Sequence, residues 1–230
     1  MPLAENHLIS LLPRAERQRV IGACSDATLD LGTVLYRPGQ VTRHVYFPRS
    51  GYVSLVTADR GRPALEVGMV GREGMLGAHL ALGVDREPLH AIVQGQGSAR
   101  CLSGVAFRRE LARGTGLKRA VDRYLYILMV QLATASSCTR FHGISARLAR
   151  WLVMSQDRAG SATFPVTQAF LGYMLGVRRV SITDSAGDLQ RRGLIRYQRG
   201  VITICDRDRL VAAACPCYKD DQAAYRDLLS

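Results

Sequence analysis

The stretch VTQAFLGYMLGVRRVSITDSAGDLQRRGLIRYQRGVITICD, from Val166 to Asp206, decides the fold of the C-terminal part of the chain. Thr167 is a residue type that favours helix N-caps, so we predict a short helix over residues 168–175 that stops at Gly176. A second helix is predicted from about Arg178 to Arg191. The stretch therefore reads as two helices joined by a tight turn.

Two glycines make this pair of helices a candidate helix-turn-helix. Close packing across a tight turn needs a small residue in the first helix and a residue that tolerates positive φ in the turn. Gly172 and Gly176 occupy those two places. The expected shared core is Leu171, Val177, Ile182, Ala186 and Leu189. The opposite face of the second helix, free to enter the major groove, carries Val180, Ser181, Asp184, Asp188 and Arg191.

The run that follows Gly193 predicts a wing. LIRYQRGVITICD alternates about a turn at residues 198–200, which is typical of a β-hairpin. Between Phe164 and Leu210 the basic residues are Arg178, Arg179, Arg191, Arg192, Arg196, Arg199, Arg207 and Arg209, against Asp184, Asp188, Asp206 and Asp208. This excess supports phosphate contact. The alternative, an ordinary solvated surface, does not account for the small residues at 172 and 176.

Composition is compatible with a nucleic-acid partner. The 230 residues suffice for one or two domains, 47% of them are hydrophobic, and 31 Lys and Arg against 19 Asp and Glu give a net charge of +12. Such a molecule is attracted to polyanions, either nucleic acid or an anionic membrane. MPLAENHLISLLPRAERQRV has an early Glu5 and too short an apolar run for a signal peptide, and no apolar run is long enough to span a bilayer. We therefore expect a cytoplasmic protein without a membrane partner.

The region before residue 100 predicts a small β domain. Eleven of the 22 glycines lie between Leu31 and Gly97. Between them are short β-rich runs, Thr33–Tyr36, His44–Phe47, Tyr52–Thr57, Ala64–Met69 and Ala91–Gln94. Turns at such regular spacing predict an antiparallel sandwich or barrel.

A long helix is predicted after Gly116, because no proline or glycine follows until Gly143. Val121, Leu125, Leu128, Leu132 and Ala135 follow the 4-3-4-3 spacing of a coiled-coil seam, which predicts a homodimer. A long core helix in a monomer remains the alternative, since periodicity does not say what covers the apolar face. A further helix is expected over about Ser145–Gln156, with Leu148, Leu152 and Val153 facing inward.

The chain resembles the Crp/Fnr family of bacterial transcription regulators. VTQAFLGYMLGVRRVSITDSAGDLQRRGLI matches the DNA-binding signature of the family, and SARLARWL matches the helix that leads into it. The resemblance implies an α+β fold: a cyclic-nucleotide-binding-like antiparallel β-roll of the jelly-roll type over residues 1–116, a long dimerisation helix over 117–143, and a winged helix-turn-helix over 144–230. It also implies a homodimer that binds double-stranded DNA, with RNA polymerase as a partner if the protein activates transcription.

The resemblance also assigns roles within the DNA-binding domain. The implied contact residues are Thr167, Gln168, Arg178, Arg179, Val180, Ser181, Thr183, Asp184 and Arg199. Thr167 and Gln168 start the first motif helix, where the family contacts phosphates. Arg179, Val180 and Asp184 fall where the family reads bases. The best-known pattern of the family has glutamate in place of Val180 and arginine in place of Asp184. The best-known target half-site of the family is therefore not expected here.

The effector is not identified by the sequence. Leu89 and His90 stand where a cyclic-nucleotide-binding roll carries arginine and serine to hold the phosphate, so control by cyclic AMP is not expected. Leu132 and Ala133 also replace the polar pair that would meet the base. The nearby residues Arg72, Glu73 and Arg86 could supply a substitute anchor. A cyclic-nucleotide-responsive or a haem- or redox-responsive regulator is the alternative, with His79, His90 and Cys101 as the haem candidates.

No cofactor, metal site or catalytic activity is predicted. Of the six cysteines, only Cys24 lies near the N-terminus, where the iron–sulfur sensors of the family hold their cluster. Cys215 and Cys217 form one close pair, whereas a four-ligand site normally has two. The chain has no P-loop, GxSxG, HExxH or dinucleotide fingerprint, which argues against an enzyme. A regulatory module that acts on another protein is a further alternative, but it would not require the glycines at 172 and 176.

Overall fold

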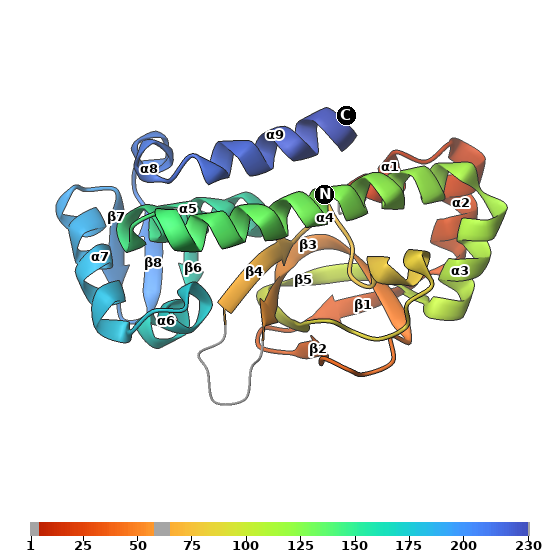
Figure 1. Cartoon of the computed structure of the whole chain (residues 1–230), viewed down its shortest axis with the longest axis horizontal. Helices are drawn as coiled ribbons and strands as arrows, with labels where there is room; N and C mark the ends of the chain where they lie inside the picture. The colour runs from red at the N-terminus through yellow and green to blue at the C-terminus, as the bar shows by residue number, and fades with distance from the viewer. Residues whose placement is uncertain (1–4, 58–64, 230) are drawn as a thin grey trace.

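The computed structural model describes residues 5–57 and 65–229, which form two lobes bridged by one long helix (Figure 1). The N-terminal lobe contains α1 (His7–Ser10), α2 (Arg14–Ala23), β1 (Ser25–Leu29), β2 (Val34–Tyr36), β3 (His44–Thr57), β4 (Leu65–Val70), η1 (Ala78–Leu82), β5 (His90–Ser103) and α3 (Gly104–Arg113). Its strands pair antiparallel in the order β1-β5-β3-β4, with β2 added to β5. The predicted antiparallel β-roll is confirmed.

Two of the predicted short strands are one long strand, so the turn expected between them was wrong. His44–Phe47 and Tyr52–Thr57 both lie in β3, and the register against β5 shifts around Gly51. Gly51 has φ of 71°, and a Cβ there would lie 2.2 Å from the carbonyl oxygen of Gly95. The glycine therefore makes a bulge that bends a continuous strand instead of ending it. Ala64, expected to start the next strand, lies outside the described residues.

Helix α4 (Thr115–Phe141) runs along the length of the molecule, and α5 (Ile144–Ala159) follows after a break at Gly143 (Figure 1). Val121, Tyr124 and Ile127 on one face of α4 are fully buried in the core that it shares with the roll. Helix α9 (Cys217–Leu229) packs along another face, where Gln131 Nε2 donates to the Tyr225 hydroxyl at 2.8 Å. Helix α4 is therefore covered on two sides within its own chain.

The C-terminal lobe has the predicted winged helix-turn-helix. It contains β6 (Thr163–Pro165), α6 (Gln168–Leu175), α7 (Arg179–Arg191), β7 (Ile195–Gln198), β8 (Val201–Ile204) and α8 (Arg207–Ala213). The strands form an antiparallel sheet in the order β6-β8-β7. The predicted core is confirmed, since Leu171, Ile182, Ala186 and Leu189 are buried together and Val177 packs against them. The α5 residues Leu148, Leu152 and Val153 complete this core, as predicted.

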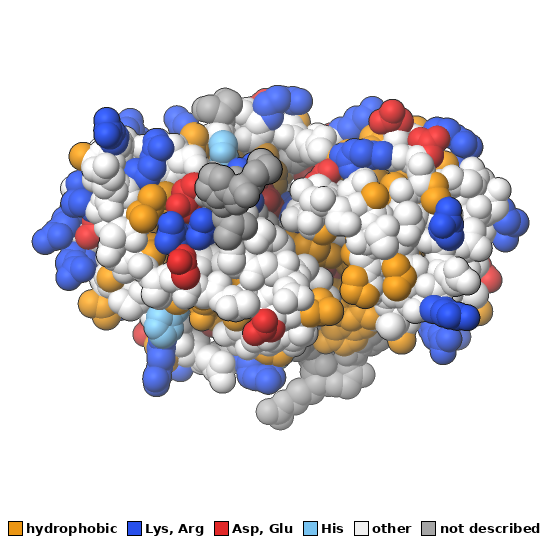
Figure 2. Space-filling view, turned by 180° about the vertical axis from the view of Figure 1, so that it is seen from behind, with side chains coloured by type: hydrophobic (Ala, Val, Ile, Leu, Met, Phe, Trp, Pro, Cys, Tyr) orange, Lys and Arg blue, Asp and Glu red, His pale blue; other side chains and the backbone are white. Residues whose placement is uncertain are grey.

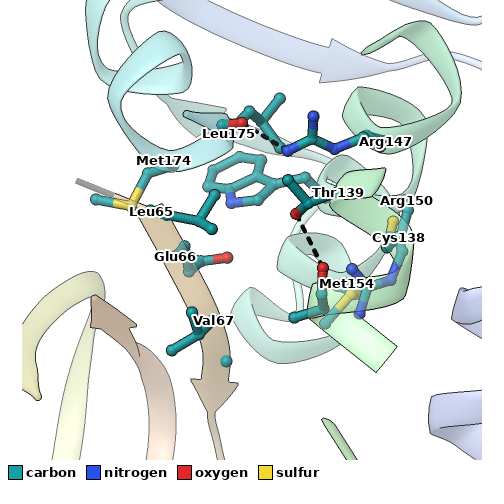
Figure 3. Close-up of a pocket in the computed structure, with 13 residues that line it drawn as sticks. Leu65, Glu66, Val67, Cys138, Thr139, Arg147, Arg150, Met154, Met174 and Leu175 are labelled. Carbon is teal, nitrogen blue, oxygen red and sulfur yellow. Dashed lines mark hydrogen bonds between the residues drawn. The ribbon is translucent and has the colours of Figure 1, made fainter. Parts of the chain in front are cut away.

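The two lobes pack directly against each other. Met174 of α6 is buried against Val56 of β3, with Phe170 and Ile92 beside them. Arg147 donates to the carbonyl oxygen of Leu175 at 2.6 Å and so ties α5 to the end of α6 (Figure 3).

Within the described part of the chain, none of the helices combines the length and the apolar character needed to cross a membrane.

Candidate nucleic-acid interface

The turn between α6 and α7 has the geometry that its two glycines predict. Thr167 Oγ1 caps α6 by accepting from the Phe170 N–H at 3.2 Å. Gly176 ends the helix with φ of 65°, in the left-handed region where a side chain is strained. A Cβ on Gly172 would lie 2.9 Å from the Val177 carbonyl oxygen, so only glycine allows the chain to fold back this closely. The start of α7 is thereby fixed against α6.

Helix α7 presents its predicted DNA-reading residues to solvent. Arg178 is the N-cap, Arg179 and Asp184 are exposed, and Val180 exposes 61% of its surface. Ser181 is half-buried and lies nearer the core. Val180 is therefore accessible to a partner, as the predicted role in base reading requires.

Thr183 and Gln168 are joined across the motif, which the sequence did not reveal. Thr183 Oγ1 donates to Gln168 Oε1 at 2.8 Å and lies 3.2 Å from the Arg179 carbonyl oxygen. The bond holds the Gln168 side chain beside the start of α7 and occupies its carbonyl oxygen. The Gln168 amide nitrogen is then the atom of this side chain that can donate to a phosphate.

The wing is a tight hairpin held against the motif. Arg199 and Gly200 form its two-residue loop, with φ of 50° and 75°, the pattern of a type I′ turn. The Tyr197 hydroxyl donates to the Val166 carbonyl oxygen at 2.8 Å, and Gln190 Oε1 accepts from the Tyr197 N–H at 2.7 Å. Sequence reasoning missed Tyr197 and Gln190, because only the fold brings the end of α7 beside the wing.

A shallow, open groove runs between the wing and the start of both motif helices. It is lined by Thr167, Gln168, Ala169, Arg179, Tyr197, Arg199 and Gly200. Four of the predicted contact residues thus meet in one place, although they lie up to 32 positions apart in the sequence. The groove combines two guanidinium groups with a helix N-terminus, an arrangement suited to phosphate.

Only some of the predicted basic residues are free to meet DNA. Asp188 lies 3.7 Å from Arg191 Nη2 and 3.4 Å from Arg192 Nη1, and Asp157 lies 2.6 Å from Arg207 Nη2. In the described part of the chain no ion pair holds Arg178, Arg179, Arg196 or Arg199. Lys and Arg side chains occur at both ends of the face seen in Figure 2, with hydrophobic ones gathered between. Net charge alone therefore does not single out the predicted interface, but four of its predicted basic residues carry charge that no neighbouring carboxylate neutralises.

The predicted dimer residues differ in exposure. Val121 and Ala135 are buried in their own chain, Leu125 and Leu128 are half-buried, and Leu132 is 44% exposed. On the same side of α4, Tyr126 is 56% exposed and Met129 66% exposed. The apolar surface that α4 leaves open is thus centred on Tyr126, Met129 and Leu132.

An apolar cavity lies in the roll beside α4. Its walls include Tyr36, Leu55, Val67, Met75, Leu76, His79, Glu87, Leu89, Leu128 and Leu132, and no Lys or Arg is among the described residues that line it. Burial raises the pKa of Glu87 to about 7, although this carboxylate accepts a hydrogen bond from Thr42 at 2.5 Å. A neutral or acidic wall does not favour an anionic ligand.

The substitute phosphate anchor considered from the sequence is not assembled at this cavity. Arg158 Nε donates to Glu73 Oε1 at 2.7 Å, so Glu73 is already paired. Arg86 is exposed, and its Nη1 donates to the Gly39 carbonyl oxygen at 3.0 Å. Arg72, Glu73 and Arg86 are all absent from the cavity wall.

A second, smaller pocket lies where β4 of the N-terminal lobe faces α5 and α6 (Figure 3). Glu66 enters it from β4, facing Arg147, Arg150 and Met154 on α5. Burial raises the pKa of Glu66 to about 7, against the opposing effects of a hydrogen bond from Ser54 and of Arg150 and Arg158. Docking of the lobes therefore buries a titratable carboxyl group.

Comparison with known proteins identifies one domain and the overall fold. Residues 146–213 match the family described as the Crp-like helix-turn-helix domain. No curated protein sequence matches the chain. The chain is similar in structure to a Crp/Fnr-family regulator from Eubacterium rectale, with 16% identity, a TM-score of 0.70, and coverage of 91% of this chain and 99% of that one.

Two further structures give the same result. The c-di-GMP-responsive global regulator of Xanthomonas campestris has 17% identity, a TM-score of 0.68, and coverage of 84% of this chain and 99% of that one. A CRP-family regulator of Thermus thermophilus has 20% identity, a TM-score of 0.68, and coverage of 82% and 96%. The chain thus has a β-roll joined to a winged helix. Its DNA-binding domain is Crp-like, and its fold is that of Crp/Fnr regulators, as the resemblance implied.

Proposed function

We propose that the protein is a cytoplasmic, sequence-specific DNA-binding transcription regulator of the Crp/Fnr type that acts as a homodimer. The observation that carries the proposal is the groove between α6, α7 and the wing, where Arg179 and Arg199 flank the N-terminus of α6. Neither arginine is held in an ion pair within the described chain. The proposed role is regulatory, not catalytic.

Positioning and reading are divided between different residues. Thr167, Gln168 and Arg199 contact phosphates, because they lie at the helix N-terminus and the wing tip. Arg179 reads guanine through O6 and N7, Val180 packs on a thymine methyl group, and Asp184 accepts from a cytosine amino group. Arg178, Ser181 and Thr183 support this contact at the start of α7, with Thr183 orienting Gln168.

The second copy docks on the open face of α4. Tyr126, Met129 and Leu132 form an exposed apolar stripe on a helix that is otherwise covered by the roll and by α9. Pairing of two such stripes buries them and relates the two DNA-binding domains by a two-fold axis. Half-sites about one helical turn apart, some 34 Å, are then expected in the target.

Control by cyclic AMP is not part of the proposal. The cavity beside α4 offers Leu89 and Glu87 where a cyclic phosphate would need positive charge. Calorimetry with cyclic AMP and cyclic GMP should therefore give no tight binding. A dissociation constant in the micromolar range or below would overturn this part of the proposal. The small-molecule effector remains unassigned, and RNA polymerase is a partner if the regulator activates.

The proposal is tested by selecting bound sequences from random double-stranded DNA with the purified chain. We expect an enriched, inverted-repeat site whose binding weakens steeply with salt. Enrichment of a site without two-fold symmetry would overturn the homodimer. No enrichment over many rounds, with correctly folded protein, would overturn sequence-specific binding.

A further inference from the structure

Three cysteines and one histidine meet at the end of helix α4. Cys138 Sγ lies 3.5 Å from Cys215 Sγ, and Cys217 Sγ lies 3.5 Å from His142 Nδ1. All four potential ligand atoms lie within 4.8 Å of one another. The sequence concealed this cluster, because Cys138 and His142 are more than 70 positions away from the Cys215–Cys217 pair.

The fold assembles the cluster from two rigid pieces. Cys138 lies in the last turn of α4, and His142 follows directly after the helix as its C-cap. Pro216 separates the other two cysteines, and Cys217 begins α9. The Cys215 N–H donates to the Ala146 carbonyl oxygen at 3.4 Å, which seats this segment on the start of α5.

The cluster is shielded from solvent and lies among positive charges. Cys138, Cys215 and Cys217 expose 2%, 4% and 5% of their surface, and His142 is half-buried. Figure 3 shows Arg150 next to Cys138, and Arg150 Nη2 also pairs with Asp221 at 2.5 Å. The positive charge of Arg150 beside the cluster favours thiolate ligands.

The spacing matches one tetrahedral ion. Zinc–sulfur bonds of about 2.3 Å place tetrahedral ligand sulfurs about 3.8 Å apart. The 3.5 Å between the sulfurs of Cys138 and Cys215 and the 4.8 Å limit of the cluster bracket that value. An iron–sulfur cluster places its own iron and sulfide atoms between the cysteine sulfurs, so it needs more widely spread ligands. The sulfurs of Cys138 and Cys215 are also too far apart for a disulfide bond.

We propose that Cys138, His142, Cys215 and Cys217 bind one structural zinc ion, which fastens α9 to the junction of α4 and α5. Three thiolates and one imidazole are a closed zinc ligand set. With Zn²⁺ they carry one net negative charge, and the Arg150 guanidinium, which Asp221 shares, lies beside Cys138. Because the DNA-binding domain joins the long helix at this junction, the ion fixes the start of α5.

The direct test is elemental analysis of the full-length protein, purified under reducing conditions and incubated with zinc chloride before desalting. We expect about one zinc per chain. The variants Cys138→Ser and Cys215→Ser should lose it, whereas Cys205→Ser, at an exposed cysteine outside the cluster, should keep it. Less than a tenth of one equivalent in both the unsubstituted protein and Cys205→Ser would overturn the proposal.

Cobalt reports on the ligands without relying on variant stability. Replacing zinc with Co²⁺ in the unsubstituted protein should give the intense visible bands of a tetrahedral ion with thiolate ligands. Octahedral, weakly absorbing cobalt would overturn the proposed ligand set. Removing zinc with a chelator should also lower the melting temperature, and adding zinc back should restore it. A melting temperature insensitive to both steps would overturn the structural role.

Discussion

Arg158 at the end of α5 donates its Nε hydrogen to Oε1 of Glu73, 2.7 Å away in the segment that follows β4. The side chain of Arg158 is 9% exposed and that of Glu73 is 25% exposed. The same carboxylate oxygen accepts from the Gly71 N–H at 3.1 Å. This ion pair joins the DNA-binding lobe to the roll. It also occupies the Glu73 carboxylate, which is then not available to bind a ligand.

Replacing one partner of this pair should destabilise the fold. Glu73→Gln leaves the Arg158 guanidinium buried without its counter-charge, which should cost about 2 to 3 kcal/mol of unfolding free energy. This is less than for a fully buried pair, because Glu73 keeps some contact with water. Urea denaturation measures the change. Asp122→Asn, which breaks the exposed pair with Lys118, is the control and should cost less than about 1 kcal/mol. Equal effects of the two substitutions would contradict the assigned role.

Base reading and phosphate positioning should separate at Arg179 and Arg199. Arg179→Ala should cost about 1 to 3 kcal/mol on the preferred site and much less on random DNA. At Arg199, where φ is 50°, asparagine is the substitution that removes the charge without straining the turn, so Arg199→Asn is preferable to Arg199→Ala. It should weaken binding to all sequences alike and reduce the salt slope by about one unit. Binding to a panel of single-base variants checks both.

Asp184 provides the complementary measurement on the same panel. Its carboxylate repels phosphate, so Asp184→Ala should relax base preference while leaving non-specific binding equal or stronger. If Arg179→Ala and Arg199→Asn lost affinity by the same factor on every variant, base reading would not reside in Arg179. An unchanged preference in Asp184→Ala would place that side chain in solvent.

Charge on the open face of α4 should separate the dimer. Met129→Glu puts a carboxylate at the centre of the exposed stripe without disturbing the buried residues of the helix. We expect a monomer by sedimentation. DNA affinity should fall at least tenfold, because each DNA-binding domain then binds its half-site without a linked second domain. Val105→Glu adds the same charge to an exposed apolar position on α3 and should remain dimeric. This site is a better test than Leu128, which is half-buried in its own chain. A Met129→Glu protein that sediments as a dimer would move the interface elsewhere.

The buried carboxyl of Glu66 should make stability depend on pH. Its pKa is raised in the folded state from 4.5 to about 7. Ionisation of this carboxyl therefore lowers the free energy of unfolding: the loss is absent below about pH 4.5 and grows until about pH 7. Glu66→Gln keeps a hydrogen-bonding partner for Ser54 but cannot ionise. The variant should match the unsubstituted protein near pH 4.5 and be more stable by about 1 to 3 kcal/mol at pH 8. Glu87 titrates in the same range in both proteins, so the difference between their denaturation curves isolates Glu66. If the unfolding free energies of the two proteins differed by the same amount at every pH, the prediction would be contradicted.

Local signals in the sequence predicted local structure well. The glycines at 172 and 176 and the cap at Thr167 specify the turn, because positive φ and close backbone approach constrain single residues. The same reasoning failed at Gly51, where a positive φ makes a bulge within β3. A glycine signals an unusual backbone conformation, but the pairing partner decides whether the strand ends there.

What the sequence by itself determined was the order and type of the elements and the class of the DNA-binding domain, since periodicity, capping and turn chemistry act over a few residues. Only the tertiary structure decided which surfaces remain open. It covered Val121 and Ala135 and left Met129 exposed, and it formed the open groove that Arg179 and Arg199 line together. It also brought Cys138 to Cys215 across 77 positions. Such encounters depend on how whole helices pack, and no pattern confined to one segment contains that information.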